Sequence, residues 1–224
     1  MGVRGKAAEA ASRQIAPKVA GGFVRQVLDR AIDGIGPLPS AKASADGRLV
    51  DAGGDVEQAI SRLIRTHTAL AGAQGFVTNL GGITSLAVSV PANVVGVTLV
   101  QAHLVAAIAA VRGYDLENPR VRNAILVCML GEDAVKDLIK DGTLPSAPMT
   151  LATSPVHSAE LDTIVSHEVT AELITRTAGR RAVTLIGRRV PLVGGAVGAG
   201  SDGWLTWQIG QYAARELRDR NVSA

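Results

Sequence analysis

Four histidines are the side chains best suited to chemistry in this sequence, because imidazole changes its charge near neutral pH and can act as acid, base or ligand. His67 falls on the apolar stripe of a predicted helix, and His103, together with Gln101, interrupts a long apolar segment near its middle. Buried polar groups need partners. We therefore predict a buried polar site of His67, Gln101 and His103. At His67 the pattern favours a core histidine with satisfied hydrogen bonds over a ligand or proton carrier.

The remaining histidines do not complete a metal motif. His167-Glu168 matches the start of H-E-x-x-H, but position 171 is Ala, so the second histidine ligand is missing. Glu160 shares a helix face with His167, and His157 lies in the loop before them. This pattern favours a solvated charged face over a metal site, and we expect neither a metal nor a cofactor.

A glycine motif near the end of the sequence, Gly198–Gly203, matches G-x-G-x-x-G. A dinucleotide site needs a strand before this motif and a second strand about 20 residues later. The sequence stops at Ala224, and we expect no such strand. Small residues instead allow helix backbones to approach closely, and we predict this role for Gly194, Gly195, Gly198 and Gly200.

Basic and aromatic residues gather towards the end of the sequence. The arginines are Arg176, Arg180, Arg181, Arg188 and Arg189, with the apolar segment Ala182–Ile186 between them. Arginines beside apolar side chains can hold phospholipid head groups, and tryptophan favours the membrane interface. We expect membrane contact from Arg180, Arg181, Arg188, Arg189, Trp204 and Trp207, with a solvated helix end as the alternative.

The most unusual feature is a run without any Asp, Glu, Lys or Arg, from Thr66 to Val111. Pro91 divides it into Phe76–Val90 and Val94–Val111, which are predicted to form an apolar helical hairpin. The second half is apolar almost all round, which indicates burial in protein or in lipid. We expect lipid contact from Phe76, Leu80, Leu86, Val88 and Pro91.

Helical periodicity recurs along most of the chain and predicts an all-α fold. Pro17 and Gly21-Gly22 predict a kink or break in a helix over residues 6–35, and the Pro and Gly residues of 36–54 predict a loop. Further helices are predicted from Asp55 onward, over 119–130, 132–140, 158–178 and 192–220, with a loop over 141–157 and no strand at Ala182–Ile186.

These elements predict a compact multi-helix bundle with a central apolar helical hairpin. Residues 1–36 are expected to form an N-terminal amphipathic helical arm, residues 37–54 a linker, and residues 55–224 the main helical domain.

The composition of the sequence argues against several classes of function. The net charge of +3 and the aromatic content of 3% are too low for a typical nucleic-acid interface, so we expect no nucleic acid. Cys128 is the single cysteine, so no disulfide forms within the chain, and we expect it in the core. Charges interrupt the N-terminal segment, which does not resemble a signal peptide. We expect a cytoplasmic protein, bound peripherally to the membrane or partly inserted in it.

Two stretches resemble the bacterial EcsC protein family over roughly residues 55–220. They are GFVTNLGGITSLAVSVPANVVGVTLVQAHLVAAIAAVRGYDLENPRVRNAILVCMLG and RRVPLVGGAVGAGSDGWLTWQIGQYAAREL. The matching positions are Gly75, Gly82, Pro91, Gly113, Tyr114, Asp115, Gly131, Pro191, Gly194, Gly198 and Ala213. The family is named for a protein encoded beside an ABC transporter, and the resemblance implies membrane association or, more loosely, a hydrolase. It implies no catalytic residue, and Ser201-Asp202 departs from its pattern.

The sequence thus favours a membrane-associated helical protein that binds lipid or a membrane-protein partner, as an accessory to transport or secretion. Homo-oligomers are compatible with this function. The alternative is a hydrolase-like enzyme that acts on an apolar substrate and uses His67, His103 or His167.

Overall fold

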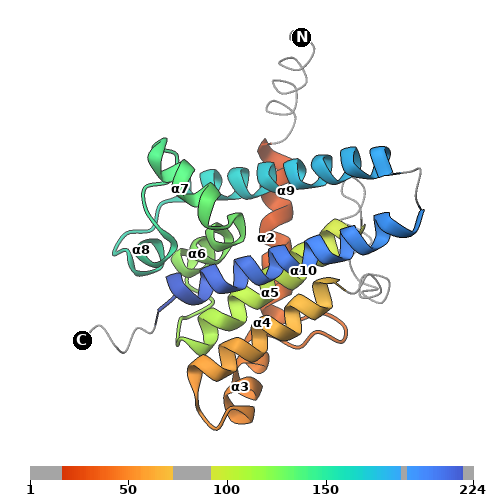
Figure 1. Cartoon of the computed structure of the whole chain (residues 1–224). Helices are drawn as coiled ribbons and strands as arrows, with labels where there is room; N and C mark the ends of the chain where they lie inside the picture. The colour runs from red at the N-terminus through yellow and green to blue at the C-terminus, as the bar shows by residue number, and fades with distance from the viewer. Residues whose placement is uncertain (1–16, 73–91, 188–190, 219–224) are drawn as a thin grey trace.

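The computed structural model describes residues 17–72, 92–187 and 191–218, and their regular secondary structure is helical (Figure 1). The helices are α2 (Pro17–Asp33), α3 (Ala41–Asp51), α4 (Val56–Gly72), α5 (Ala92–Val111), α6 (Pro119–Leu130), α7 (Glu132–Lys140), α8 (Pro148–Thr153), α9 (Ala159–Gly187) and α10 (Pro191–Glu216). A single β-bridge joins Ile35 and Leu38 in these ranges. The predicted all-α class is therefore confirmed.

Local sequence signals set several helix ends. Asn118 caps α6 by accepting a hydrogen bond from the Arg120 backbone N–H at 3.0 Å, and Pro119 opens the helix with its fixed φ. Gly113 and Gly131 have φ values of +79° and +88°, which glycine adopts without steric cost. They end α5 and α6 as the sequence predicted.

Helix α5 lies at the centre of the bundle and contacts α2, α3, α4, α6 and α10 (Figure 1). Val94–Val111 is the one stretch of the described residues that is long and apolar enough to cross a membrane, and 89% of it is buried inside the protein. A helix that is apolar all round needs such burial. In this fold the surrounding helices provide it. The other half of the predicted hairpin, Phe76–Val90, lies outside the described residues.

The N-terminal part of the chain differs from the prediction. α2 continues through Gly21-Gly22 without a break, and its buried residues Val24, Val27 and Leu28 belong to the common core. The predicted loop over 36–54 contains α3. Packing of small alanines in the core and the Ser40 cap at its start outweigh the helix-breaking effect of the glycine and prolines nearby.

Two other boundaries were also wrong. The predicted loop over 141–157 contains the short helix α8, which Pro148 opens. α9 does not end near Ala178 but continues to Gly187, so Ala182–Ile186 is helical. Cys128 is fully buried as predicted, and burial raises the pKa of its thiol because the thiolate loses hydration.

Glycine allows α10 to approach its neighbours closely at Gly210, a position that the sequence analysis did not single out. A Cβ atom on Gly210 would lie 2.9 Å from Ile64 Cγ1 and 3.0 Å from Leu104 Cδ2, so the backbone of α10 fits between α4 and α5. The predicted Gly198–Gly203 motif lies within this continuous helix, so it does not form the strand-to-helix turn of a dinucleotide site. The surroundings of Gly194, Gly195, Gly198 and Gly200 lie outside the described part of the structure.

Candidate functional site

The structure brings His67 of α4 and His103 of α5 into direct contact. His67 Nε2 lies 2.7 Å from His103 Nδ1, and the ring centroids are 5.0 Å apart. The two rings are 3% and 1% exposed. His67 Nδ1 is 2.7 Å from the Leu63 carbonyl oxygen, and His103 Nε2 is 3.0 Å from the Pro39 carbonyl oxygen and 3.4 Å from Ser44 Oγ. These contacts form a continuous chain of polar atoms.

Two neutral rings cannot supply a proton to every contact in this chain. The Leu63 and Pro39 carbonyls can only accept, so their contacts need protons on His67 Nδ1 and His103 Nε2. The contact between His67 Nε2 and His103 Nδ1 needs a third proton, and two neutral rings carry only two. Burial lowers the pKa of each ring to about 4, because a charged imidazolium would lose its hydration, and the ordinary value is 6.5.

Gln101 does not join the histidine pair. Its side chain leaves α5 in another direction and donates through Nε2 to Thr206 Oγ1 of α10 at 3.1 Å. The predicted polar site is therefore two sites on different sides of α5. Gln101 has its partner within the core, and neither histidine faces a carboxylate in the contacts that the structure describes. A hydrolase using His67, His103 or His167 stays a prediction.

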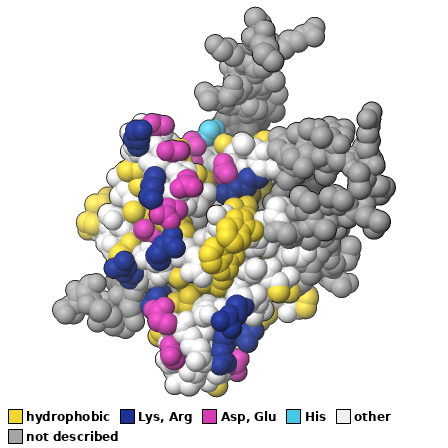
Figure 2. All heavy atoms as spheres, viewed as in Figure 1, with side chains coloured by type: hydrophobic (Ala, Val, Ile, Leu, Met, Phe, Trp, Pro, Cys, Tyr) yellow, Lys and Arg dark blue, Asp and Glu magenta, His cyan; other side chains and the backbone are white. Residues whose placement is uncertain are grey.

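Trp204 and Trp207 form the main exposed aromatic feature of the described surface. Their rings stack with centroids 4.9 Å apart, and the side chains are 59% and 39% exposed. Figure 2 shows a hydrophobic strip over α10 in the middle of this face, with Lys, Arg, Asp and Glu side chains to the left of it and below it. The residues of α10 that are exposed from Ser201 to Gln208 carry no formal charge.

The stacked pair lies near the point where α4 ends and α5 begins. A Cβ atom on Gly203, next to Trp204, would lie 3.9 Å from Cα of Gly72, the last residue of α4. The end of α9 and the start of α10 extend further towards the same side of the molecule, on the right in Figure 1. We call this side, from Gly72 and Ala92 to Trp204 and Trp207, the tryptophan end.

Most of the other predicted lipid contacts cannot be placed. Phe76, Leu80, Leu86, Val88, Pro91, Arg188 and Arg189 lie outside the described residues, as do the side chains of Arg180 and Arg181 in α9. Arg176, another arginine of the cluster, does have described contacts. It pairs with Glu172 at 2.7 Å and donates to the Met129 and Leu130 carbonyls at 3.2 and 2.7 Å. Arg176 therefore satisfies carbonyl groups at the end of α6, and its guanidinium is not available to a lipid head group.

A second polar cluster escaped the sequence reasoning, because its members are distant in sequence. His157 Nε2 lies 3.2 Å from Asp162 Oδ2. Asn123 of α6 donates to Asp162 Oδ1 at 2.7 Å, and Arg25 of α2 donates to Asn123 Oδ1 at 2.6 Å and to Ser166 Oγ at 2.9 Å. Burial lowers the pKa of the Arg25 guanidinium, and Asp162 opposes that effect. Only the five-residue spacing of His157 and Asp162 was visible in the sequence, and it is not a recognised motif.

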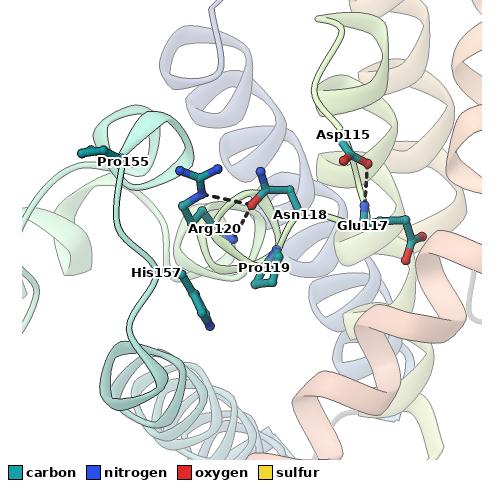
Figure 3. Close-up of a pocket in the computed structure, with 7 residues that line it drawn as sticks. All are labelled: Asp115, Glu117, Asn118, Pro119, Arg120, Pro155 and His157. Carbon is teal, nitrogen blue, oxygen red and sulfur yellow. Dashed lines mark hydrogen bonds between the residues drawn. The ribbon is translucent and has the colours of Figure 1, made fainter.

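This cluster borders an open cleft. Figure 3 shows Asp115, Glu117, Asn118, Pro119 and Arg120 on one side and Pro155 and His157 on the other. Within the described residues, no group of three or more His, Cys, Asp or Glu side chains is arranged to hold a metal ion.

Comparisons with known proteins identify the family. A search of curated proteins finds no match. A search of solved structures also finds none. A family model, described as the EcsC protein family, matches residues 54–222. This range holds α4 to α10, while α2 and α3 lie before it and still pack into the same core. Since the match covers most of the sequence, the chain belongs to the EcsC protein family.

Proposed function

We propose that the protein binds peripherally to a membrane surface through the tryptophan end. The observation that carries this proposal is the exposed stacked pair Trp204 and Trp207 on an uncharged face of α10. Tryptophan combines a large apolar surface with an N–H donor, and it is enriched where hydrocarbon meets head groups. Two adjacent exposed indoles are unfavourable in water, and transfer to that interface would remove much of their apolar surface from it.

The segments that join α4 to α5 and α9 to α10 also favour membrane contact at the tryptophan end. The sequence between Gly72 and Ala92 contains the predicted lipid contacts Phe76 and Leu80, and it is joined to the body at the tryptophan end. Arg188 and Arg189 lie between α9 and α10, whose ends extend towards this side (Figure 1). Apolar and basic segments attached to one side of a protein favour binding to a surface of anionic lipid.

The burial of α5 favours peripheral binding over a transmembrane role for that helix. Its apolar residues contact five other helices, so exposing them to lipid would require the core to open. Binding to a membrane-protein partner through the same face, in support of transport or secretion, stays a further prediction.

Vesicle flotation tests the proposal. We expect the wild-type protein to float with vesicles of phosphatidylcholine and phosphatidylglycerol. The double substitution Trp204→Ser and Trp207→Ser should weaken partitioning at least about tenfold, since each buried indole contributes on the order of 1–2 kcal/mol. Val50, which is 80% exposed on α3, provides the control: Val50→Ser should float like the wild type.

The charge contribution is tested separately. The double substitution Arg188→Glu and Arg189→Glu should reduce flotation with the anionic vesicles and leave weak binding to phosphatidylcholine unchanged. Wild-type protein that stays at the bottom of the gradient with both kinds of vesicle would refute the proposed function. Flotation of the tryptophan variant at the wild-type level would refute the assigned surface.

A further inference from the structure

The cleft beside α6 and α8 consists of two adjoining cavities. The smaller has a volume of about 220 Å³ and lies between α6, α8 and the loop that leads into α9. The larger has a volume of about 470 Å³ and extends towards Asp115 and Glu117. Arg120, Pro155 and His157 line both of them. The cleft belongs to the opposite end of α9 from Gly187, so it is separate from the proposed membrane contact (Figure 1).

Arg120 is held in place with part of its guanidinium unused. Its Nε donates to Asn118 Oδ1 at 3.2 Å, and its Nη1 donates to the Ser154 carbonyl oxygen. Nη2 has no polar partner among the described residues. Figure 3 shows the Arg120 head group between Asn118 and Pro155. A fixed guanidinium with free N–H groups is well suited to bind a carboxylate or a phosphate oxygen.

His157 is a second prepared polar group in the same cleft. The Asp162 carboxylate, 3.2 Å from Nε2, favours a proton on that nitrogen and leaves Nδ1 without a polar partner in the described part of the chain. Asp162 is itself held by the Asn123 amide at 2.7 Å and lies 3.6 Å from the Arg25 guanidinium. The contact with Asp162 therefore holds the His157 imidazole in place, and the side chain is 38% exposed at the cleft.

The wall of the smaller cavity is largely apolar. Leu151, Val156 and Leu161 line it together with Pro145. Val156 is 71% exposed, so its apolar surface is accessible to a ligand at the rim of this cavity. In the larger cavity the carboxylates of Asp115 and Glu117 would repel an anion. An anionic group is thus favoured at Arg120, with an apolar portion directed into the smaller cavity.

We propose that this cleft binds a small amphiphilic anion, whose carboxylate or phosphate contacts Arg120 and whose short alkyl portion packs against Leu151, Val156 and Leu161. His157 Nδ1 is an acceptor while Nε2 carries the proton, so it provides a contact at the rim for a protonated oxygen of the head group. The same chemistry is present in a free fatty acid, an alkyl phosphate and the anionic end of a lipid. The proposal does not depend on Trp204 or Trp207.

Isothermal titration calorimetry with octyl phosphate and with octanoate tests the proposal, using the full chain below the micelle concentration of each probe. We expect binding of at least one probe, and much weaker binding of inorganic phosphate and of octanol, which each lack half of the recognised chemistry. Arg120→Gln should weaken binding at least tenfold, and His157→Gln should weaken it to a smaller extent. Similar binding of inorganic phosphate and octyl phosphate would refute the apolar half of the site.

Matched variants separate binding from folding. Arg62 is also held by a backbone carbonyl and a side-chain amide, but it does not line the cleft, so Arg62→Gln should bind like the wild type. Thr150 lies on the exposed side of α8 and lines the smaller cavity, so Thr150→Trp should block the alkyl portion without disturbing the core. The exposed Thr175→Trp on α9 is its control. Absence of binding by the wild type to both amphiphiles, or wild-type affinity in both Arg120→Gln and Thr150→Trp, would overturn the proposal.

Discussion

Lowering the pH from 7 to 4 is expected to reduce the free energy of unfolding by several kcal/mol through the pair His67 and His103. Burial lowers the pKa of both rings from 6.5 to about 4. Each pKa unit corresponds to about 1.4 kcal/mol, so each ring can contribute on the order of 3 kcal/mol. Arg48 of α3, which acts electrostatically on His67, opposes protonation further.

The sign of this effect follows from proton binding. Below pH 6.5 the unfolded chain binds protons at both histidines, whereas the folded protein does not until about pH 4. Stability is therefore fully present above pH 6.5 and falls as the pH drops towards 4. Protonating both rings would also place two N–H groups against each other across the 2.7 Å contact, which would break it.

Urea unfolding at a series of pH values measures the effect. The double substitution His67→Gln and His103→Gln removes both titrating groups and should give a shallower decline of stability between pH 7 and 4 than the wild type. His167 provides the control, because it is 41% exposed and lies beside Glu168, so His167→Gln should keep the wild-type slope. If stability declines equally with pH in the double variant and the wild type, the His67–His103 pair is not the cause of the decline.

The second large effect is expected from Gly34→Ala, in the turn between α2 and α3. Gly34 has a φ of +87°, and a Cβ atom there would lie 2.7 Å from backbone atoms of Leu38, Pro39 and Ser40. Backbone atoms of a tight turn cannot move aside as a flexible side chain can. The strained φ and the clash together should reduce the free energy of unfolding by at least about 3 kcal/mol.

Gly36→Ala is the matched control for this substitution. Gly36 also has a positive φ, of +57°, but a Cβ atom there would have no neighbour within 4 Å. Gly36→Ala should therefore lower the free energy of unfolding only through its strained φ, by about 1 kcal/mol. The difference in urea midpoint between the two variants isolates the clash. Because the Pro39 carbonyl contacts His103 at 3.0 Å, Gly34→Ala should also disturb the histidine pair. Equal losses in the two variants would contradict the close packing of this turn.

Local signals in the sequence were sufficient for much of the architecture. The charge-free run from Thr66 predicted that the helix ending at Val111 would be buried in protein or in lipid, because a segment that is apolar all round cannot face water, and the fold buries it in protein. Gly113 and Gly131 marked helix ends because their backbone conformations favour glycine. The family resemblance depended on the same structural positions and was confirmed.

Local signals failed where packing outweighed them. The glycine pair Gly21-Gly22 is destabilising in an isolated helix, but the core contacts of Val24 and Leu28 hold α2 in a helical conformation. The same holds for α3, which has few helix-favouring signals apart from Ser40 and its alanines, and which is held by core contacts of Ala41 and Ala45.

By itself, the sequence determined the helical class, the apolar central helix and the apolar surroundings of His67 and His103, because these depend on composition and on the period of one helix. Only the tertiary structure decided that His67 meets His103, that Gln101 does not, and that Asp162, Asn123 and Arg25 support His157. Such contacts depend on how separate helices dock. The free energy of docking comes from the whole core, so no local pattern around any one of these residues specifies its partner.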